Sequence, residues 1–179
     1  MNVEEMIDDI LVREGGFVNH PDDKGGPTNH GVTQATLSEY LQRDASVQDV
    51  KDLDIDTARD IYKKRYYQGP KIDRLPESIQ PFVFDCAINH GSRRAIKFVQ
   101  KVCNESGFGQ LSEDGLMGAK TATGADQCCK EMGKWMLLTL IQERKQFYLE
   151  IVVNNPRQKT FLKGWMNRAN SFLENLKEA

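Results

Sequence analysis

Two acidic residues near the start of the chain have sharply different expected surroundings. Glu14 follows an apolar helical stripe and directly precedes Gly15, whereas Asp23 lies nine residues later in a polar segment beside Lys24. A helix end and an apolar face both disfavour a charged carboxylate at Glu14, while Asp23 should stay ionised. A protonated carboxyl paired with an ionised carboxylate is the equipment that many enzymes use to hydrolyse glycosidic bonds. The sequence therefore predicts a general acid at Glu14 and a second carboxylate at Asp23.

A hydroxyl side chain follows this pair. Thr28, five residues after Asp23, is in a position to orient the attacking water. Asp22 stands directly beside Asp23, so the residues leave open which of the two is the second carboxylate. The alternative is that Asp23 and Thr28 are ordinary turn residues.

The elements that must position these groups follow from the spacing of apolar residues. Over residues 3–11 an apolar residue recurs every three or four positions, which predicts an amphipathic helix ending at Gly15 and Gly16. At about 100° per residue, Glu14 falls in the middle of the apolar stripe, where its carboxyl would lose water. The alternative is a partly exposed glutamate in the last helical turn, with no special role. Residues 17–33, rich in Gly, Pro, Asn and Asp, predict a small irregular β hairpin or loop.

The rest of the chain has helical patterns. Capping residues are expected at Thr36, with Glu39 as its capping-box partner, and at Asp56 and Ser92. The fold class is therefore mainly α, a helical bundle with one small β hairpin next to the active-site cleft. The expected helices cover about 36–43, 57–68, 81–90, 93–106, 125–153 with an interruption near Gly133, and 160–177.

Composition excludes several classes of function. The 179 residues include 39% hydrophobic residues, 24 basic and 26 acidic residues, which gives a net charge of −2. This balance argues against binding nucleic acid or an anionic membrane. The apolar run at 135–141 is too short to span a bilayer, and acidic residues occupy the N-terminus where a secretory signal needs a basic start. We expect no membrane insertion and no signal peptide.

Metal binding is an alternative that the sequence does not favour. His20, His30 and His90, together with Asp22 or Asp23, could form a zinc site for a peptidase or amidase. None of the histidines has the i, i+4 pairing of a helical zinc motif. We therefore expect no metal and no other cofactor, and full activity after chelation.

The cysteines and tryptophans have simpler interpretations. Trp135 and Trp165 each lie in an apolar helical pattern and are expected in the core. The cysteines lack metal-ligand spacing and are expected to be reduced packing residues: Cys86, Cys103, Cys128 and Cys129.

Residues 14–33, EGGFVNHPDDKGGPTNHGVT, resemble the signature of glycoside hydrolase family 108. Three later stretches, FDCAINHG at 84–91, EDGLMGAKT at 113–121 and FLKGWMNR at 161–168, are similar to the peptidoglycan-binding region that accompanies this family. The chain departs from the signature at Lys24, where the family often has Pro, and at Asp22, which duplicates an acid. The matching positions are Glu14, Gly15, Gly16, Phe17, Asn19, Pro21, Asp23, Gly25, Gly26, Thr28, Gly31, Val32 and Thr33.

The resemblance implies a lysozyme-like fold that hydrolyses the β-1,4 bond between N-acetylmuramic acid and N-acetylglucosamine in bacterial peptidoglycan. Glu14 takes the family's catalytic acid position. We expect a catalytic lobe at 1–91 and a helical peptidoglycan-binding lobe at 92–179, packed as one compact unit. Asp85 and Asn89, one helical turn apart, are candidates for binding N-acetyl sugar groups, although a structural role in satisfying backbone groups is equally open.

A short muramidase without a secretion signal is similar to bacteriophage endolysins. We therefore expect a monomer that stays in the host cytoplasm until a separate pore-forming protein releases it to the wall. An exported bacterial effector would look similar. Two other functions stay open: a lytic transglycosylase, which would use the same acid without water, and a non-catalytic peptidoglycan-binding module.

Overall fold

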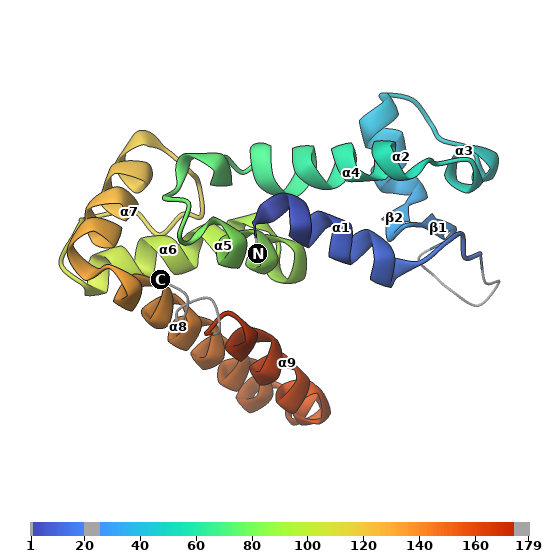
Figure 1. Ribbon diagram of the computed structural model, residues 1–179. Coiled ribbons are helices and arrows are strands. Elements are labelled where there is room, and N and C mark those ends of the chain that lie inside the picture. Colours follow the sequence, from blue (N-terminus) through green and yellow to red (C-terminus); the bar gives the residue numbers. More distant parts are fainter. Residues whose placement is uncertain (1, 20–25, 174–179) are drawn as a thin grey trace. The chain divides into compact units, whose positions relative to one another are not determined.

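The computed structural model describes residues 2–19 and 26–173 of the chain. Among these residues helices dominate and one two-stranded antiparallel sheet is present, so the predicted mainly α fold class is confirmed (Figure 1). The chain divides into two compact units, Met1–Gly69 and Pro70–Ala179. This division precedes the predicted lobe boundary at residue 91, and the assignment of lobes at 1–91 and 92–179 stays a prediction. Among the described helices, none combines the length and the apolar character needed to cross a bilayer.

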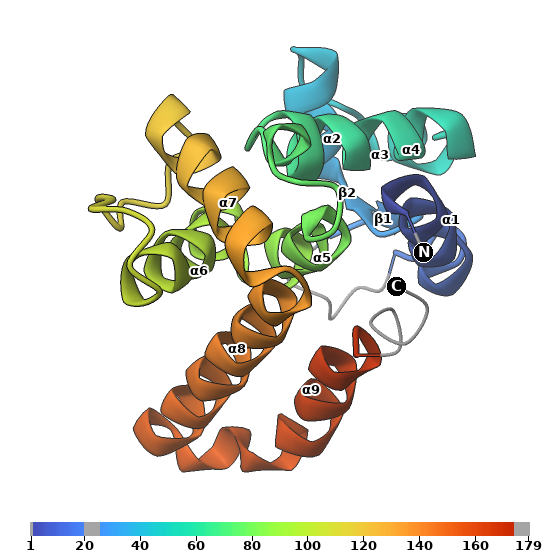
Figure 2. The ribbon, with the colours of Figure 1, turned by 60° about the vertical axis from the view of Figure 1, so that its left-hand side comes forward.

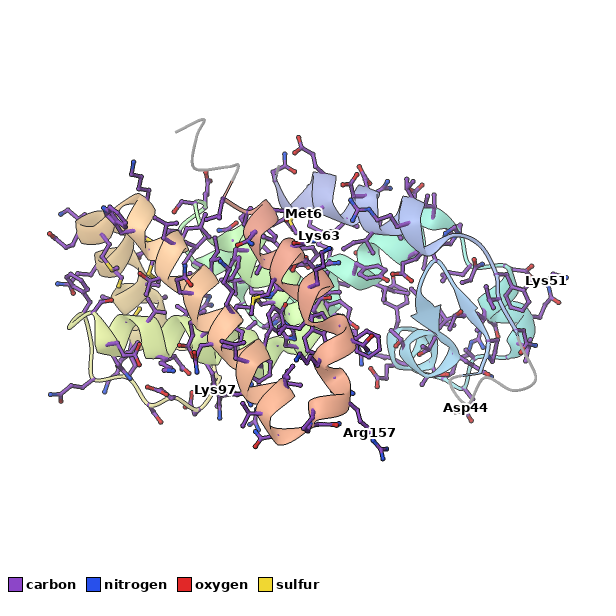
Figure 3. All side chains as sticks on the ribbon, turned by 90° about the horizontal axis from the view of Figure 1, so that it is seen from below. Met6, Asp44, Lys51, Lys63, Lys97 and Arg157 are labelled. Carbon is purple, nitrogen blue, oxygen red and sulfur yellow. The ribbon has the colours of Figure 1, made fainter. Side chains whose placement is uncertain are left out.

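The first unit places two longer helices against a small hairpin. Helix α1 packs on α4, and Figure 3 shows Met6 of α1 close to Lys63 of α4. The elements are α1 (Val3–Glu14), β1 (Thr28–Asn29), β2 (Val32–Thr33), α2 (Gln34–Leu41), α3 (Val47–Lys51), α4 (Ile55–Lys63) and the π-helical segment η1 (Lys64–Gln68).

Helix α1 begins and ends where the sequence predicts. The side chain of Asn2 accepts a hydrogen bond from the Glu5 amide, and the Glu5 carboxylate accepts one from the Asn2 amide, both at 2.9 Å. This capping box satisfies two of the amides that a helix start leaves unpaired. Gly15 has a positive φ of 69°, which glycine adopts readily, and the helix ends before it. The buried face consists of Val3, Met6, Ile7 and Leu11.

The hairpin is as small as expected. Strands β1 and β2 pair Thr28 with Thr33, and the turn between them is His30–Gly31. Both turn residues have positive φ, 51° and 74°, as in the type I′ turns that match the twist of a hairpin. The chain then enters α2 directly after Thr33.

Asn29 attaches the hairpin to α3. Its side chain is 5% exposed, and its amide donates to the carbonyl oxygens of Val50 at 3.0 Å, Lys51 at 3.1 Å and Leu53 at 3.4 Å. These carbonyls lie at and beyond the end of α3, where helical partners run out. One buried side chain therefore holds the hairpin turn in place.

Replacing Asn29 with Asp tests this attachment. The carboxylate is nearly the same size but has no N–H donor, and it would face three carbonyl oxygens in a buried position. We expect a loss of about 3 kcal/mol in the free energy of unfolding, measured by urea denaturation. Asn19→Asp, at an exposed position before the hairpin, is the control and should cost almost nothing. An unchanged urea midpoint for Asn29→Asp would show that this attachment contributes little.

The helix caps lie earlier than predicted. Thr33, not Thr36, caps α2, and its hydroxyl oxygen accepts from the Thr36 amide at 3.2 Å. Asp54, not Asp56, caps α4. The predicted residues instead fall in the first helical turns, because an N-cap needs the extended backbone that Thr33 and Asp54 have.

The described residues of the second unit form helices and connecting loops, and no strand. Gly133, at φ 56°, separates α7 from α8 as predicted, and Arg157 lies at the turn that joins α8 to α9 (Figure 3). Gly91, rather than Ser92, occupies the position before α6. Figure 2 shows α8 and α9 as a helical hairpin. The elements are η2 (Ile72–Arg74), α5 (Gln80–His90), α6 (Ser92–Glu105), α7 (Ala119–Met132), α8 (Lys134–Asn154), η3 (Pro156–Gln158) and α9 (Lys159–Ser171).

Packing in this unit corrects one expectation. Trp135 is 62% exposed, so its predicted core position is wrong: it occupies the first turn of α8, beyond the residues that α8 buries. Trp165 is half-buried and stacks on Tyr148 with ring centroids 5.3 Å apart. All four cysteines are free thiols as expected, and Cys129 is the one that is not fully buried.

Candidate active site

Glu14 is the last residue of α1, and its side chain is exposed. The expectation that an apolar stripe would exclude water from it is wrong. The buried face of α1 stops at Leu11, so the last helical turn carries no apolar cover. Glu14 is therefore open to solvent and accessible to a substrate.

The hairpin turn and α4 both reach Glu14. A Cβ atom placed on Gly31 would lie 3.0 Å from Glu14 Cγ, 3.2 Å from Glu14 Oε2 and 2.4 Å from the Tyr62 hydroxyl oxygen. Real Cβ atoms essentially never approach an oxygen this closely, so a side chain at position 31 would force the Tyr62 hydroxyl to shift. Three segments of the first unit, the end of α1, the hairpin turn and α4, therefore meet at the Glu14 carboxyl group.

Thr28 lies on the hairpin that carries Gly31. It is half-buried, and its backbone exchanges two hydrogen bonds of 2.8 Å with Val18. The structure thus places Thr28 on the element that contacts Glu14. Asp23 and Asp22 lie outside the described residues, so their predicted roles stay predictions.

The alternative zinc site draws no support from the described residues. Within 2–19 and 26–173, no three His, Cys, Asp or Glu side chains are grouped so as to hold a metal ion. His30 is a turn residue whose carbonyl oxygen lies 3.4 Å from the Tyr62 hydroxyl, and His20 lies outside the described residues.

Asp85 and Asn89, the predicted sugar-binding residues, lie on α5 in the second unit. Asp85 is 3% exposed, and its oxygens accept from Arg144 Nη1 and from Arg168 Nη2, each at 2.7 Å. Asn89 is exposed, and its amide donates to the Asp85 carbonyl oxygen at 2.7 Å. These contacts favour a structural role for Asp85, and sugar binding by either residue stays a prediction.

Sequence reasoning missed Arg144, which is fully buried in α8. Its guanidinium lies over the ring of Phe82, 5.6 Å from the centroid, and its Nε donates to the Tyr148 hydroxyl at 2.6 Å. The available signal was its position three and four residues after Ile141 and Leu140, which places a charge on the buried stripe. A buried arginine requires a partner, and Asp85 supplies it.

The same cluster makes the second unit sensitive to acid through His90. Burial, followed by the positive charge of Arg144, lowers the pKa of His90 from 6.5 to about 4. Arg168 and Arg94 lower the pKa further, while Asp85 opposes them. The folded state therefore favours neutral His90.

We expect this unit to lose stability as the pH falls from about 6.5 to about 4. Above this window His90 is neutral whether the chain is folded or not, and within it the unfolded chain binds the extra proton. Thermal melts across this range measure the effect. In His90→Gln the loss of melting temperature between pH 6.5 and pH 4 should be smaller than in the parent. The same loss in both proteins would exclude His90 as the source of the pH dependence.

The chain is similar to two family models and to proteins of solved structure. Residues 7–91 match the family model described as Glycosyl hydrolase 108, and residues 94–170 match one described as Predicted Peptidoglycan domain. Ten chains of solved structure match. One, titled "Structure of Brucella abortus SagA", is 32% identical, with a TM-score of 0.71 over 96% of this chain and 91% of that chain. No curated protein matches.

Proposed function

Since the chain belongs to the glycosyl hydrolase 108 family and is a peptidoglycan-degrading glycoside hydrolase, we propose that it is a muramidase of the endolysin kind. The bond cleaved is the β-1,4 linkage between N-acetylmuramic acid and N-acetylglucosamine. The observation that carries the proposal is the position of Glu14, exposed at the end of α1 against the hairpin turn, inside the matched segment.

In the proposed mechanism Glu14 is the general acid that protonates the leaving glycosidic oxygen. Asp23, as an ionised carboxylate, activates the water or stabilises the positive charge that develops on the sugar. Thr28 orients that water. Glu14 lies in water in the free enzyme, so the bound glycan itself must cover the carboxyl group and exclude solvent before proton transfer.

The second unit supports peptidoglycan as the substrate through its match to a peptidoglycan domain. We propose that the enzyme acts as a monomer without a cofactor. In this proposal it accumulates in the cytoplasm of a host bacterium and reaches the wall once a separate pore-forming protein opens the inner membrane.

The enzymatic claim is tested on purified sacculi. The protein should lower their turbidity and release reducing sugar ends in proportion to enzyme concentration. A protein that binds sacculi but neither lowers their turbidity nor releases reducing ends would be a binding module, and the proposal would be wrong.

The cellular claim is tested by expressing the protein in a bacterium. Culture turbidity should stay constant until the inner membrane is permeabilised and then fall rapidly. Lysis on expression alone would contradict the need for a pore-forming partner.

A further inference from the structure

Tyr62 and Glu14 come together from distant parts of the first unit. Measured from the position that a Cβ on Gly31 would occupy, the Tyr62 hydroxyl oxygen lies at 2.4 Å and Glu14 Oε2 at 3.2 Å. Both oxygens therefore border the small space left by the missing side chain of Gly31. Neither the family matches nor the predicted site residues assign a role to Tyr62.

Tyr62 is held firmly in this place. It is 6% exposed on the buried face of α4, and its ring lies against that of Tyr66 with centroids 5.8 Å apart. Its hydroxyl donates to the His30 carbonyl oxygen over a long 3.4 Å. The hydroxyl is therefore fixed beside the hairpin turn but only weakly bound to it.

Tyr62 also keeps its proton. Burial, followed by the negative charge of Glu14, raises the pKa of Tyr62 to about 12. At any pH at which a wall hydrolase works, the side chain is a neutral hydrogen-bond donor next to the Glu14 carboxyl group.

We infer that Tyr62 is the positioning residue for the general acid: its buried hydroxyl lies beside Gly31, next to the Glu14 carboxyl group, and donates a hydrogen bond to the carboxylate that forms. The inference rests on the proposed role of Glu14. Glu14 transfers its proton to the glycosidic oxygen as the bond to the sugar breaks, and the negative charge left on Glu14 attracts the Tyr62 hydroxyl away from the His30 carbonyl. Tyr62 loses no proton in this step.

Tyr62→Phe removes this hydroxyl and little else. We expect kcat on purified peptidoglycan to fall by about 10-fold with little change in KM, since the donor acts only as charge develops. This loss is smaller than the ~10²-fold or greater loss for a full oxyanion donor, because the hydroxyl is shared with His30. The alkaline limb of the kcat–pH profile should move to higher pH, because the ionised acid has lost a donor.

Tyr40→Phe is the matched control. Its hydroxyl donates to Asp60 Oδ2 at 2.6 Å in the same unit, away from the contacts of Glu14. The Tyr40→Phe substitution should leave kcat and the kcat–pH profile unchanged. Parent-like kcat and pH profile in Tyr62→Phe would overturn the inference, as would the same change in both variants.

A second measurement tests the contact without relying on activity. A methyl group at position 31 collides first with the Tyr62 hydroxyl. Gly31→Ala should therefore lower the melting temperature less in the Tyr62→Phe background than in the parent. The backbone strain that alanine meets at φ 74° is the same in both backgrounds, so it does not affect this difference. Equal losses would contradict the contact.

The two proposals fail in different ways. If Glu14→Gln retains full activity, the general-acid mechanism is wrong and the role of Tyr62 falls with it. If Glu14→Gln is inactive while Tyr62→Phe matches the parent, the role of Tyr62 alone is wrong.

Discussion

Replacing Glu14 with Gln should lower the rate of peptidoglycan hydrolysis by at least ~10²-fold, the usual scale for loss of a general acid. Glutamine keeps the shape and the hydrogen bonding of the side chain but has no transferable proton. Because Glu14 is exposed, its replacement should shift the free energy of unfolding by no more than about 0.5 kcal/mol. The initial rate of reducing-end release and a thermal melt measure the two quantities.

Asp9→Asn is the control for this substitution. Asp9 lies on the same helix and makes an ion pair with Arg13, with side chains 50% and 71% exposed, so its loss should change neither rate nor stability appreciably. If Glu14→Gln hydrolyses peptidoglycan at nearly the parent rate with an unchanged melting temperature, Glu14 is only an acidic residue at the end of a helix and has no catalytic role.

The largest expected effect on stability is in the second unit, at Asp85. Asp85→Asn should lower the free energy of unfolding by about 3–5 kcal/mol, because it leaves the charge of Arg144 buried without its carboxylate. The side chain of Arg144 is 0% exposed and that of Asp85 is 5% exposed, and Arg168 uses the same carboxylate. Chemical denaturation followed by helical circular dichroism measures the loss.

A surface carboxylate provides the comparison. Asp56 pairs with Arg59 but is 85% exposed, so Asp56→Asn should cost at most about 1 kcal/mol. A small loss in Asp85→Asn, together with weaker binding to peptidoglycan, would favour the sugar-binding role of Asp85 over the structural one.

Local sequence signals predicted the elements around Glu14 well. The apolar spacing and the glycines determined where α1 ends, and the Gly- and Asn-rich segment gave the hairpin. Both depend on neighbours within a few residues. The exposure of Glu14 could not be predicted in this way. The apolar spacing shows which side of a helix faces the core, but it does not show how far along the helix the neighbouring elements cover that side. Trp135 was misplaced for the same reason.

Contacts between distant residues explain what the sequence missed in the site. Tyr62 follows Glu14 by forty-eight residues, and only the packing of α1 on α4 brings the two together. The cluster around Arg144 likewise joins residues from α5, α8 and α9. In the sequence, Tyr62 and Arg144 each stand out as a polar side chain on the buried stripe of a helix. The sequence did not show which distant residues they contact.

The chemistry of the cleaved ends tests the central claim most directly. Purified sacculi are digested to completion, and the soluble fragments are identified by mass spectrometry. Hydrolysis by Glu14 with water predicts fragments that end in reducing N-acetylmuramic acid, reducible by borohydride. Fragments that end only in anhydro-N-acetylmuramic acid would show a lytic transglycosylase and contradict the hydrolytic mechanism.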